Sequence, residues 1–288
     1  MMKYTIRYVS LLAGMLTVFS SCEHKDLCFD HEAHAPKSDV HVKAVYEKEW
    51  EHTCEGGPDW EQYPAWESRF GMDYHELCPD APDGLRIQVY NEDGTNNVLN
   101  VAPEGDIVRM RPGEHSLLLY NNDTEYIVFD DMNSFASAKA TTRTRTRASY
   151  GGNPYMENTV ENTVNAPDML YGNYMENYTA ERKTETDELP VTMHPLVFTY
   201  LVRYEFSHGL EYVALARGAL AGMAGAVWLN SGRTSEEAVT ILYDCSVEDF
   251  GAQACVHSFG IPDYPNEHYT ARAERRYGLN LEVRLKNG

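Results

Sequence analysis

Cysteine is the residue type in this 288-residue chain with the most distinctive chemistry. Cys54 and Cys78 lie on either side of a Trp- and Pro-rich stretch, and Cys245 and Cys255 lie ten residues apart across an expected hairpin. Either pair could form a disulfide if the protein is exported. Free thiols that pack as small apolar side chains are the alternative, and the spacing leaves both open.

Histidine and cysteine also gather near the N-terminus, where His24, Cys28, His31 and His34 occur close together. Imidazole and thiolate groups are ligands for zinc or copper. The spacing matches no recognised metal site, and the surrounding residues are polar and lack apolar periodicity. The sequence therefore predicts a solvated tether over residues 22–39, with no metal and no cofactor.

Recognised catalytic motifs are absent from the sequence. It contains no Gly-x-Ser-x-Gly elbow, no phosphate-binding glycine-rich loop and no His-Glu-x-x-His. The 44 acidic residues could include an acid–base pair of the kind that sugar hydrolases use, but no spacing selects two of them. We therefore expect a protein that is not an enzyme.

Tryptophan is concentrated in the loop region of residues 50–83, which contains Trp50, Trp60 and Trp66. Exposed indole rings would form a stacking platform for a carbohydrate ligand. The favoured alternative is a loop that is held against the protein by its own aromatic rings. These three residues are therefore a candidate ligand contact.

The position of Cys22 predicts lipidation. Lys3 and Arg7 precede the apolar run Val9–Phe19, and two serines then come directly before Cys22. This order is typical of a secretory signal over residues 1–21, and its apolar core is too short to span a bilayer. The cysteine and its small neighbours resemble the bacterial lipobox. The sequence predicts a surface-exposed lipoprotein of the outer membrane, anchored by acyl chains such as palmitate.

Composition limits the partners. The formal charge of −20 would repel nucleic acid phosphates, so no nucleic acid partner is expected. An apolar fraction of 43% is enough for a packed core. The one basic run contains Arg143, Arg145 and Arg147. It is expected to be an exposed loop where trypsin cuts first, and a two-faced polar strand is the alternative.

Alternation of apolar and polar side chains predicts short strands between turns, which is typical of a β-sandwich. The expected strands cover residues 40–46, 85–90, 106–111, 117–120, 126–129, 198–206 and 279–285. Three glycines argue against a helix over residues 212–229. The polar run 181–188 suggests an N-terminal sandwich of residues 40–187, with a Trp- and Cys-rich loop and an irregular Arg- and Thr-rich insertion. A C-terminal sandwich of residues 188–288 would follow.

Four motifs in one order carry a family resemblance. They lie at residues 22–28, 111–124, 166–172 and 220–225, and together they resemble the fimbrillin-related lipoproteins of Bacteroidetes. The resemblance implies an all-β protein of tandem transthyretin-like antiparallel sandwiches on a lipidated tether. It also implies adhesion or a role as a fimbrial anchor or accessory subunit, without catalytic residues. A glycan-binding lipoprotein of a carbohydrate-uptake system is the alternative function.

The last expected strand is followed by Asn287-Gly288, a strong hairpin signal without a return strand. Three explanations are ranked in this order: a sandwich that closes without the strand, a truncated sequence, and a groove that accepts a partner's strand. The third would let a fimbrial subunit bind by strand addition.

Overall fold

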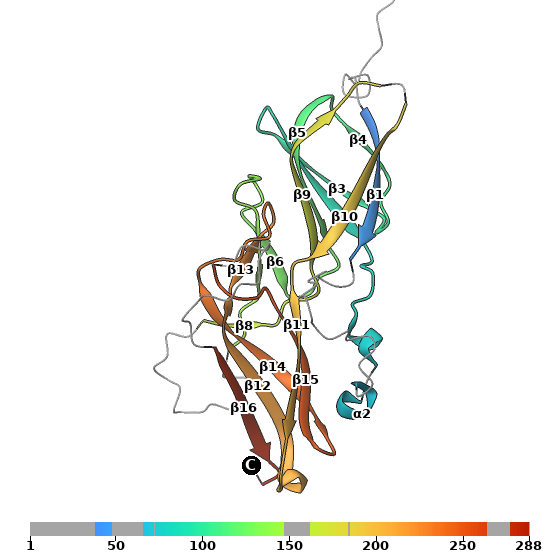
Figure 1. Ribbon diagram of the computed structural model, residues 1–288. Coiled ribbons are helices and arrows are strands. Elements are labelled where there is room, and N and C mark those ends of the chain that lie inside the picture. Colours follow the sequence, from blue (N-terminus) through green and yellow to red (C-terminus); the bar gives the residue numbers. More distant parts are fainter. Residues whose placement is uncertain are drawn as a thin grey trace, which may run out of the picture. The chain divides into compact units, whose positions relative to one another are not determined.

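The computed structural model describes residues 38–47, 66–71, 73–146, 162–183, 185–263 and 277–287. Regular structure in these residues is almost entirely β-strand (Figure 1), which confirms the predicted all-β class. The described helices are short: α2 (Trp66–Phe70), η1 (Tyr74–Leu77) and η4 (Leu210–Tyr212). None of them is long and apolar enough to cross a membrane.

The first sheet has seven strands in the order β3-β2-β5-β9-β10-β1-β4. Their bounds are β1 (Ser38–Tyr46), β2 (Leu85–Asn91), β3 (Asn96–Val101), β4 (Ile107–Met110), β5 (Gly113–Asn121), β9 (Tyr171–Ala180) and β10 (Asp187–Pro195). Val40 of β1 and Ile87 of β2 belong to one buried cluster although their strands are far apart in the strand order. The sheet therefore folds over on itself and encloses a core, as the two layers of a sandwich do.

The second sheet has six strands, with the order β11-β15-β14-β12-β16 and β8 paired to β14. Their bounds are β8 (Thr163–Asn165), β11 (Phe198–Glu205), β12 (Val213–Ala224), β14 (Ala238–Glu248), β15 (Gly251–Ser258) and β16 (Gly278–Leu285). The inward side chains of β14 and β15, among them Ile241, Tyr243 and Val256, form the core of this sheet. The hairpin expected between Cys245 and Cys255 is the β14–β15 pair.

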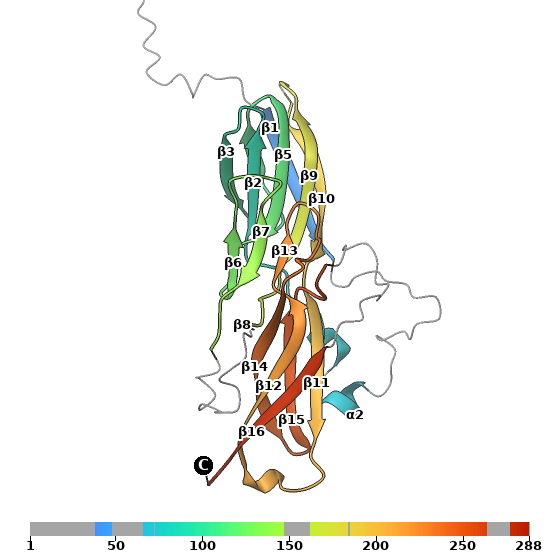
Figure 2. The same cartoon turned by 90° about the vertical axis from the view of Figure 1, so that its left-hand side faces the viewer.

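A three-stranded sheet, β13-β7-β6, completes the described structure. It consists of β6 (Ile127–Asp130), β7 (Lys139–Thr142) and β13 (Ala226–Trp228). Its buried side chains pack with Leu118 and Tyr120 of β5, so one face of that strand lies in the first core and the other face in this one (Figure 2). Strand β5 is therefore buried on both faces, as its unbroken leucine run requires.

Strand β10 does not belong to the sheet in which the sequence placed it. The segment after residue 188 was assigned to the C-terminal sandwich, but β10 pairs in parallel with β1 and antiparallel with β9 of the seven-stranded sheet. The polar run 181–188 covers the connection from β9 to β10 and the first two residues of β10. The chain changes sheets between Pro195 and Phe198. The proposed division into domains remains a prediction.

Candidate functional site

The edge of the six-stranded sheet at β16 is the candidate site for binding a partner. Among the described residues, the only strand that pairs with β16 is β12. The pairing is antiparallel and places Leu279 opposite Leu220, and Val283 opposite Ala216. On its other side β16 therefore pairs with no described strand, and an edge of this kind can take up a further strand.

The side chains of β16 add an uncovered apolar surface to this edge. Leu279, Leu281, Val283 and Leu285, here called the β16 strip, alternate with polar residues. Leu281 lies opposite Gly218, and Gly218 lies opposite the core residue Tyr243. Directly opposed side chains project on the same face of a sheet, so the strip faces the core side.

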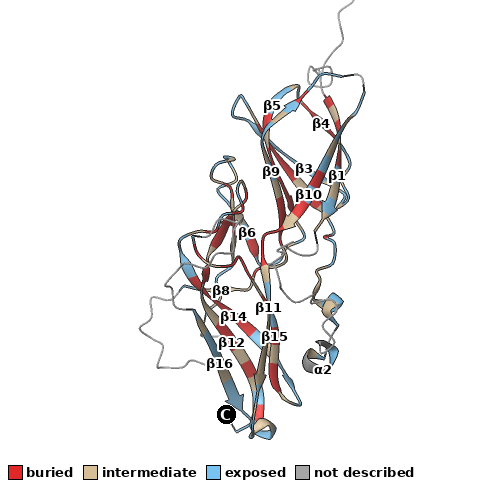
Figure 3. Cartoon of the chain, viewed as in Figure 1, coloured by how far each residue is buried: buried red, intermediate tan, exposed pale blue. Residues whose placement is uncertain are grey.

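The side chains of the β16 strip are much more exposed than those of the adjoining core. Leu279 is 51% exposed, Val283 39% and Leu285 44%, whereas Tyr243 is only 5% exposed. Figure 3 shows the corresponding change from buried to exposed residues toward β16. An added strand can pair with a sheet edge that no described strand occupies, and its apolar side chains can cover the exposed strip beside that edge.

Two tyrosines hold β16 in place. The Tyr204 hydroxyl donates to the backbone carbonyl of Asn280 at 3.2 Å, and it lies 2.9 Å from the Tyr243 hydroxyl. Burial raises the pKa of Tyr204, so its hydroxyl keeps the proton that it donates. These bonds connect β16 with β11 and β14, so the edge is positioned by side chains as well as by β12.

The cysteines of the second sheet are not joined. Cys245 and Cys255 are free thiols, because Ser246 pairs with Gln253 and this register sends the two cysteines to opposite faces. The disulfide considered for this pair is therefore wrong, and the alternative of packed thiols describes Cys245, which lies against the core. Burial, followed by the nearby Asp244 carboxylate, raises the pKa of Cys245 to about 11, and burial also raises that of Cys255. Cys78 is not part of a disulfide either, and its Sγ lies 4.0 Å from the Tyr74 carbonyl oxygen.

The basic run is more ordered than an exposed loop. Arg145 donates from its guanidinium to the Leu242 carbonyl at 3.0 Å and to Asp244 at 2.7 Å. The Arg143 backbone N–H donates to the Tyr126 carbonyl at 2.9 Å. Arg147 lies outside the described residues, and the expected trypsin cleavage in this run remains a prediction.

Several candidate residues lie outside the described residues and remain predictions. They are the lipidated Cys22, Cys54 of the first cysteine pair, and Trp50 and Trp60 of the aromatic loop. Trp66 begins α2, but its side chain is not described. Within the described part of the chain, no group of three or more His, Cys, Asp and Glu side chains is arranged to hold a metal ion.

Known proteins with similar sequences or folds include fimbrial proteins. A Bacteroides ovatus protein with the provisional name of fimbrium anchoring subunit Fim4B is 25% identical over 175 residues, which are 60% of this chain and 50% of that protein. The chain thus spans about half the length of this relative. A crystal structure from Bacteroides ovatus, described provisionally as an adhesin, aligns with a TM-score of 0.58 and 20% identity over 88% of this chain and 79% of that chain.

The fimbrial anchor protein Mfa2 from Porphyromonas gingivalis aligns with a TM-score of 0.43 and 11% identity, over 80% of this chain and 75% of that chain. The resemblance to fimbrillin-related proteins that the four motifs indicated is confirmed. The model of one family, described as a domain of unknown function (DUF5119), matches residues 61–244, which is more than half of the chain. The chain belongs to this family.

Proposed function

We propose that this protein is a cell-surface fimbrial anchor or accessory subunit, and that a neighbouring subunit adds a strand to the edge of β16. The observation that carries the proposal is the β16 edge, which pairs with no strand of the described residues other than β12 and lies beside the exposed β16 strip. The provisional name of the Bacteroides ovatus relative supports a fimbrial context for such an edge.

Strand addition uses both features of this edge. Main-chain hydrogen bonds to the donated strand supply affinity, and alternate side chains of that strand supply specificity. Apolar residues of the donor that project on the core face would cover Leu279 and Val283. Burial of apolar surface stabilises an association by roughly 25 cal/mol per Å² before the costs of binding are subtracted.

Replacement of Val283 by Lys tests the strand-addition site. The probes are synthetic peptides copied from the terminal strands of fimbrial subunits, and the measurement is the melting temperature at increasing peptide concentration. A peptide that completes the sheet should raise the melting temperature, because a ligand at 100 times its Kd stabilises the folded state by about 2.7 kcal/mol. Val283→Lys places a charge on the strip and should abolish the increase.

Arg284→Lys is the matched control, since it is the next residue of β16 and an exposed side chain on the polar face. This variant should keep the full increase in melting temperature. The melting temperature of each variant without peptide shows whether it folds. The proposal is wrong if no peptide raises the melting temperature of the wild type, or if Val283→Lys responds as the wild type does.

We further propose that the protein is held at the outer membrane by a lipid on Cys22. Several acyl chains, each contributing about 0.8 kcal/mol per buried CH₂, would give a stable anchor. Cys22→Ser should remove incorporation of radioactive palmitate and release the protein from the membrane fraction, while Cys255→Ser should change neither. Palmitate labelling of Cys22→Ser at the wild-type level would contradict the anchor.

A further inference from the structure

Strand β1 is the first described strand after the N-terminal part of the chain, and it enters the seven-stranded sheet at Ser38. It lies between two neighbours, β10 on one side and β4 on the other (Figure 1). Its pairing with β10 is parallel and runs from Val40 opposite Asp187 to Tyr46 opposite Met193. The end of the sheet at which β1 begins is here called the entry end, and the end at which β1 and β10 both finish is called the exit end.

The chain passes to the other two sheets at the exit end. Strand β10 stops there at Pro195, and β11 of the six-stranded sheet begins at Phe198. Strand β9, which follows β8 in the chain, begins at Tyr171 opposite Pro195. Strand β5 also finishes there, because Tyr120 pairs with Gly172, and the chain continues to β6. A pull on the chain before β1 and a pull from the other sheets therefore act at opposite ends of the first sheet.

Forces applied at these two ends load β1 along its own length. Because β1 and β10 are parallel, the start of β1 and the finish of β10 are pulled apart, so the ladder is sheared and does not open from one end. The hydrogen bonds of a parallel ladder are evenly spaced along the pair. They consequently share the load and must break together, which requires more force than breaking them in succession.

Side chains on both faces of the β1–β10 pair resist the same movement. Val42 of β1 is 0% exposed and belongs to the same buried cluster as Val191 and Met193 of β10. On the opposite face, the Glu188 carboxylate of β10 lies 2.6 Å from the Lys43 ammonium of β1. This ion pair is exposed and contributes little. The buried side chains matter more, because a slip of one residue would turn every side chain of β1 to the other face of the sheet.

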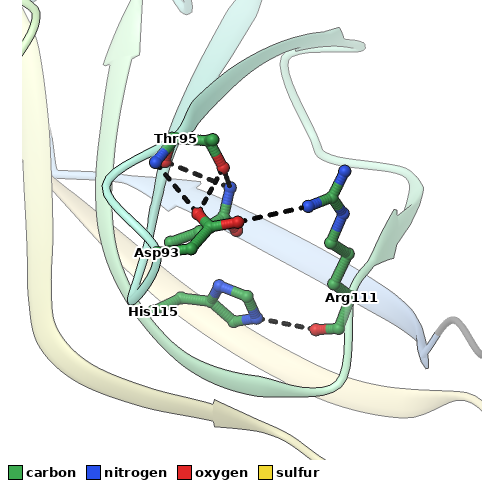
Figure 4. Close-up of polar contacts among 5 residues, drawn as sticks. Asp93, Thr95, Arg111 and His115 are labelled. Carbon is green, nitrogen blue, oxygen red and sulfur yellow. Dashed lines mark hydrogen bonds and ion pairs between the residues drawn. The ribbon is translucent and has the colours of Figure 1, made fainter.

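Strand β4 holds β1 on its other side and is itself tied to the rest of the sheet. The Val42 and Ala44 backbone N–H groups donate to carbonyl oxygens of the segment before β4, at 3.1 and 2.9 Å. At the entry end, the Arg111 carbonyl oxygen after β4 accepts a hydrogen bond from His115 Nε2 of β5 at 2.7 Å. The Arg111 guanidinium lies 3.5 Å from the carboxylate of Asp93, in the turn between β2 and β3 (Figure 4). Release of β1 therefore requires its pairing with β4 to break as well.

We propose that β1 is a mechanical clamp that keeps the first sheet folded when the N-terminal segment is under tension. The clamp rests on the proposed function for the source of its load, which is the membrane anchor on one side and the bound subunit at β16 on the other. Tension arises between these two sites whenever the subunit is pulled away from the membrane. It crosses the first sheet from the entry end to the exit end, which is the direction in which β1 resists most.

Optical-tweezers pulling on the mature chain, residues 23–288, tests the clamp. Handles at the N-terminus and the C-terminus load β1 in shear. A second geometry uses handles at the N-terminus and at the exposed residue 182, attached through Arg182→p-azidophenylalanine. This position is at the entry end, where the Ser38 hydroxyl donates to the Glu181 carbonyl, so the second geometry opens the β1–β10 ladder from one end. Release of the first sheet should need about twice the force, or more, in the shear geometry.

A disulfide across the clamp distinguishes the release of β1 from the release of the six-stranded sheet. Val45→Cys with Thr192→Cys places two cysteines at directly paired, exposed positions of β1 and β10, so the core is unchanged. Paired strands are close enough for such a bridge. The oxidised variant should lose the extension of the residues between the two cysteines, roughly 3.3–3.6 Å for each residue. The reduced variant is the matched control and should extend as the wild type does.

Two results would each overturn the clamp: equal release forces in the two geometries, and an oxidised variant that extends as far as the reduced one. Neither measurement involves a ligand, so the clamp and the proposed function can fail separately. A wild type that shows the force difference but does not respond to strand peptides would contradict the proposed function alone. A wild type that responds to the peptides but shows no force difference would contradict the clamp alone.

Discussion

The hydrogen bonds of one residue explain why the motif at residues 166–172 contains an aspartate. In the Ala-Pro-Asp motif, one carboxylate oxygen of Asp168 accepts backbone N–H groups from Glu125, Tyr126 and Ile127 at 2.8, 2.5 and 3.2 Å. These donors precede and begin β6, so Asp168 satisfies backbone groups that the strand leaves unpaired at its start. The donors lie more than forty residues from Asp168 in sequence, which is why the motif alone could not reveal the role of the carboxylate.

Gly218 is a strand residue at which an added methyl group should be damaging. It lies opposite Tyr243, and a Cβ there would overlap the tyrosine ring. The ring would have to move, and its hydrogen bond with Tyr204 would weaken. We predict that Gly218→Ala lowers the free energy of unfolding by roughly 1–3 kcal/mol, the usual cost of overpacking. Urea denaturation measures this loss.

Gly278→Ala is the matched control for this prediction. Gly278 is also a strand glycine of the same sheet, but a Cβ there would lie 3.5 Å from Ala221, an ordinary contact. This variant should unfold within about 0.5 kcal/mol of the wild type, the range of a substitution without a packing defect. If both variants lose the same stability, close packing of Tyr243 on Gly218 is not the reason for the glycine.

Strands whose apolar and polar residues alternate cleanly in sequence were predictable, because one face of each strand is turned toward a core. The expected strands at 40–46, 85–90, 198–206 and 279–285 correspond to β1, β2, β11 and β16. Gly222 has a positive φ of 89° and lies at a register shift in β12, which is a β-bulge. A bulge of this kind explains how the glycine-containing segment 212–229 includes a strand.

Other strands could not be predicted from the residues that form them. Strand β3 contains three asparagines and is mostly exposed, so it shows little apolar alternation in the sequence. Strand β8 is three residues long and pairs with β14 in parallel, and β13 joins the sheet of β6 and β7. These pairings are long-range, and they depend on which backbone edges the rest of the fold leaves open.

At the scale of the whole molecule, stability should depend on pH through opposing effects. Acidification neutralises carboxylates, and in a chain with a formal charge of −20 this reduces self-repulsion. It also protonates groups that the fold keeps neutral. His257 is such a group, because burial lowers its pKa, and the Pro167 carbonyl and Asp168 carboxylate only partly oppose this. A comparison of variants at each pH separates the histidine from the background.

We predict that His257 makes the protein less stable as the pH falls below about 6.5, the ordinary pKa of histidine. Between the lowered folded pKa and that value, the unfolded chain binds more protons than the folded one, so stability rises with pH in this window. Melting temperatures of the wild type and His257→Gln, measured from pH 7.5 to 5.0, should therefore converge or cross as the pH falls. His208→Gln, at an exposed position, should follow the wild type throughout. A constant difference between the wild type and His257→Gln over this range would show that the folded and unfolded states protonate His257 alike, and that its burial does not limit stability in acid.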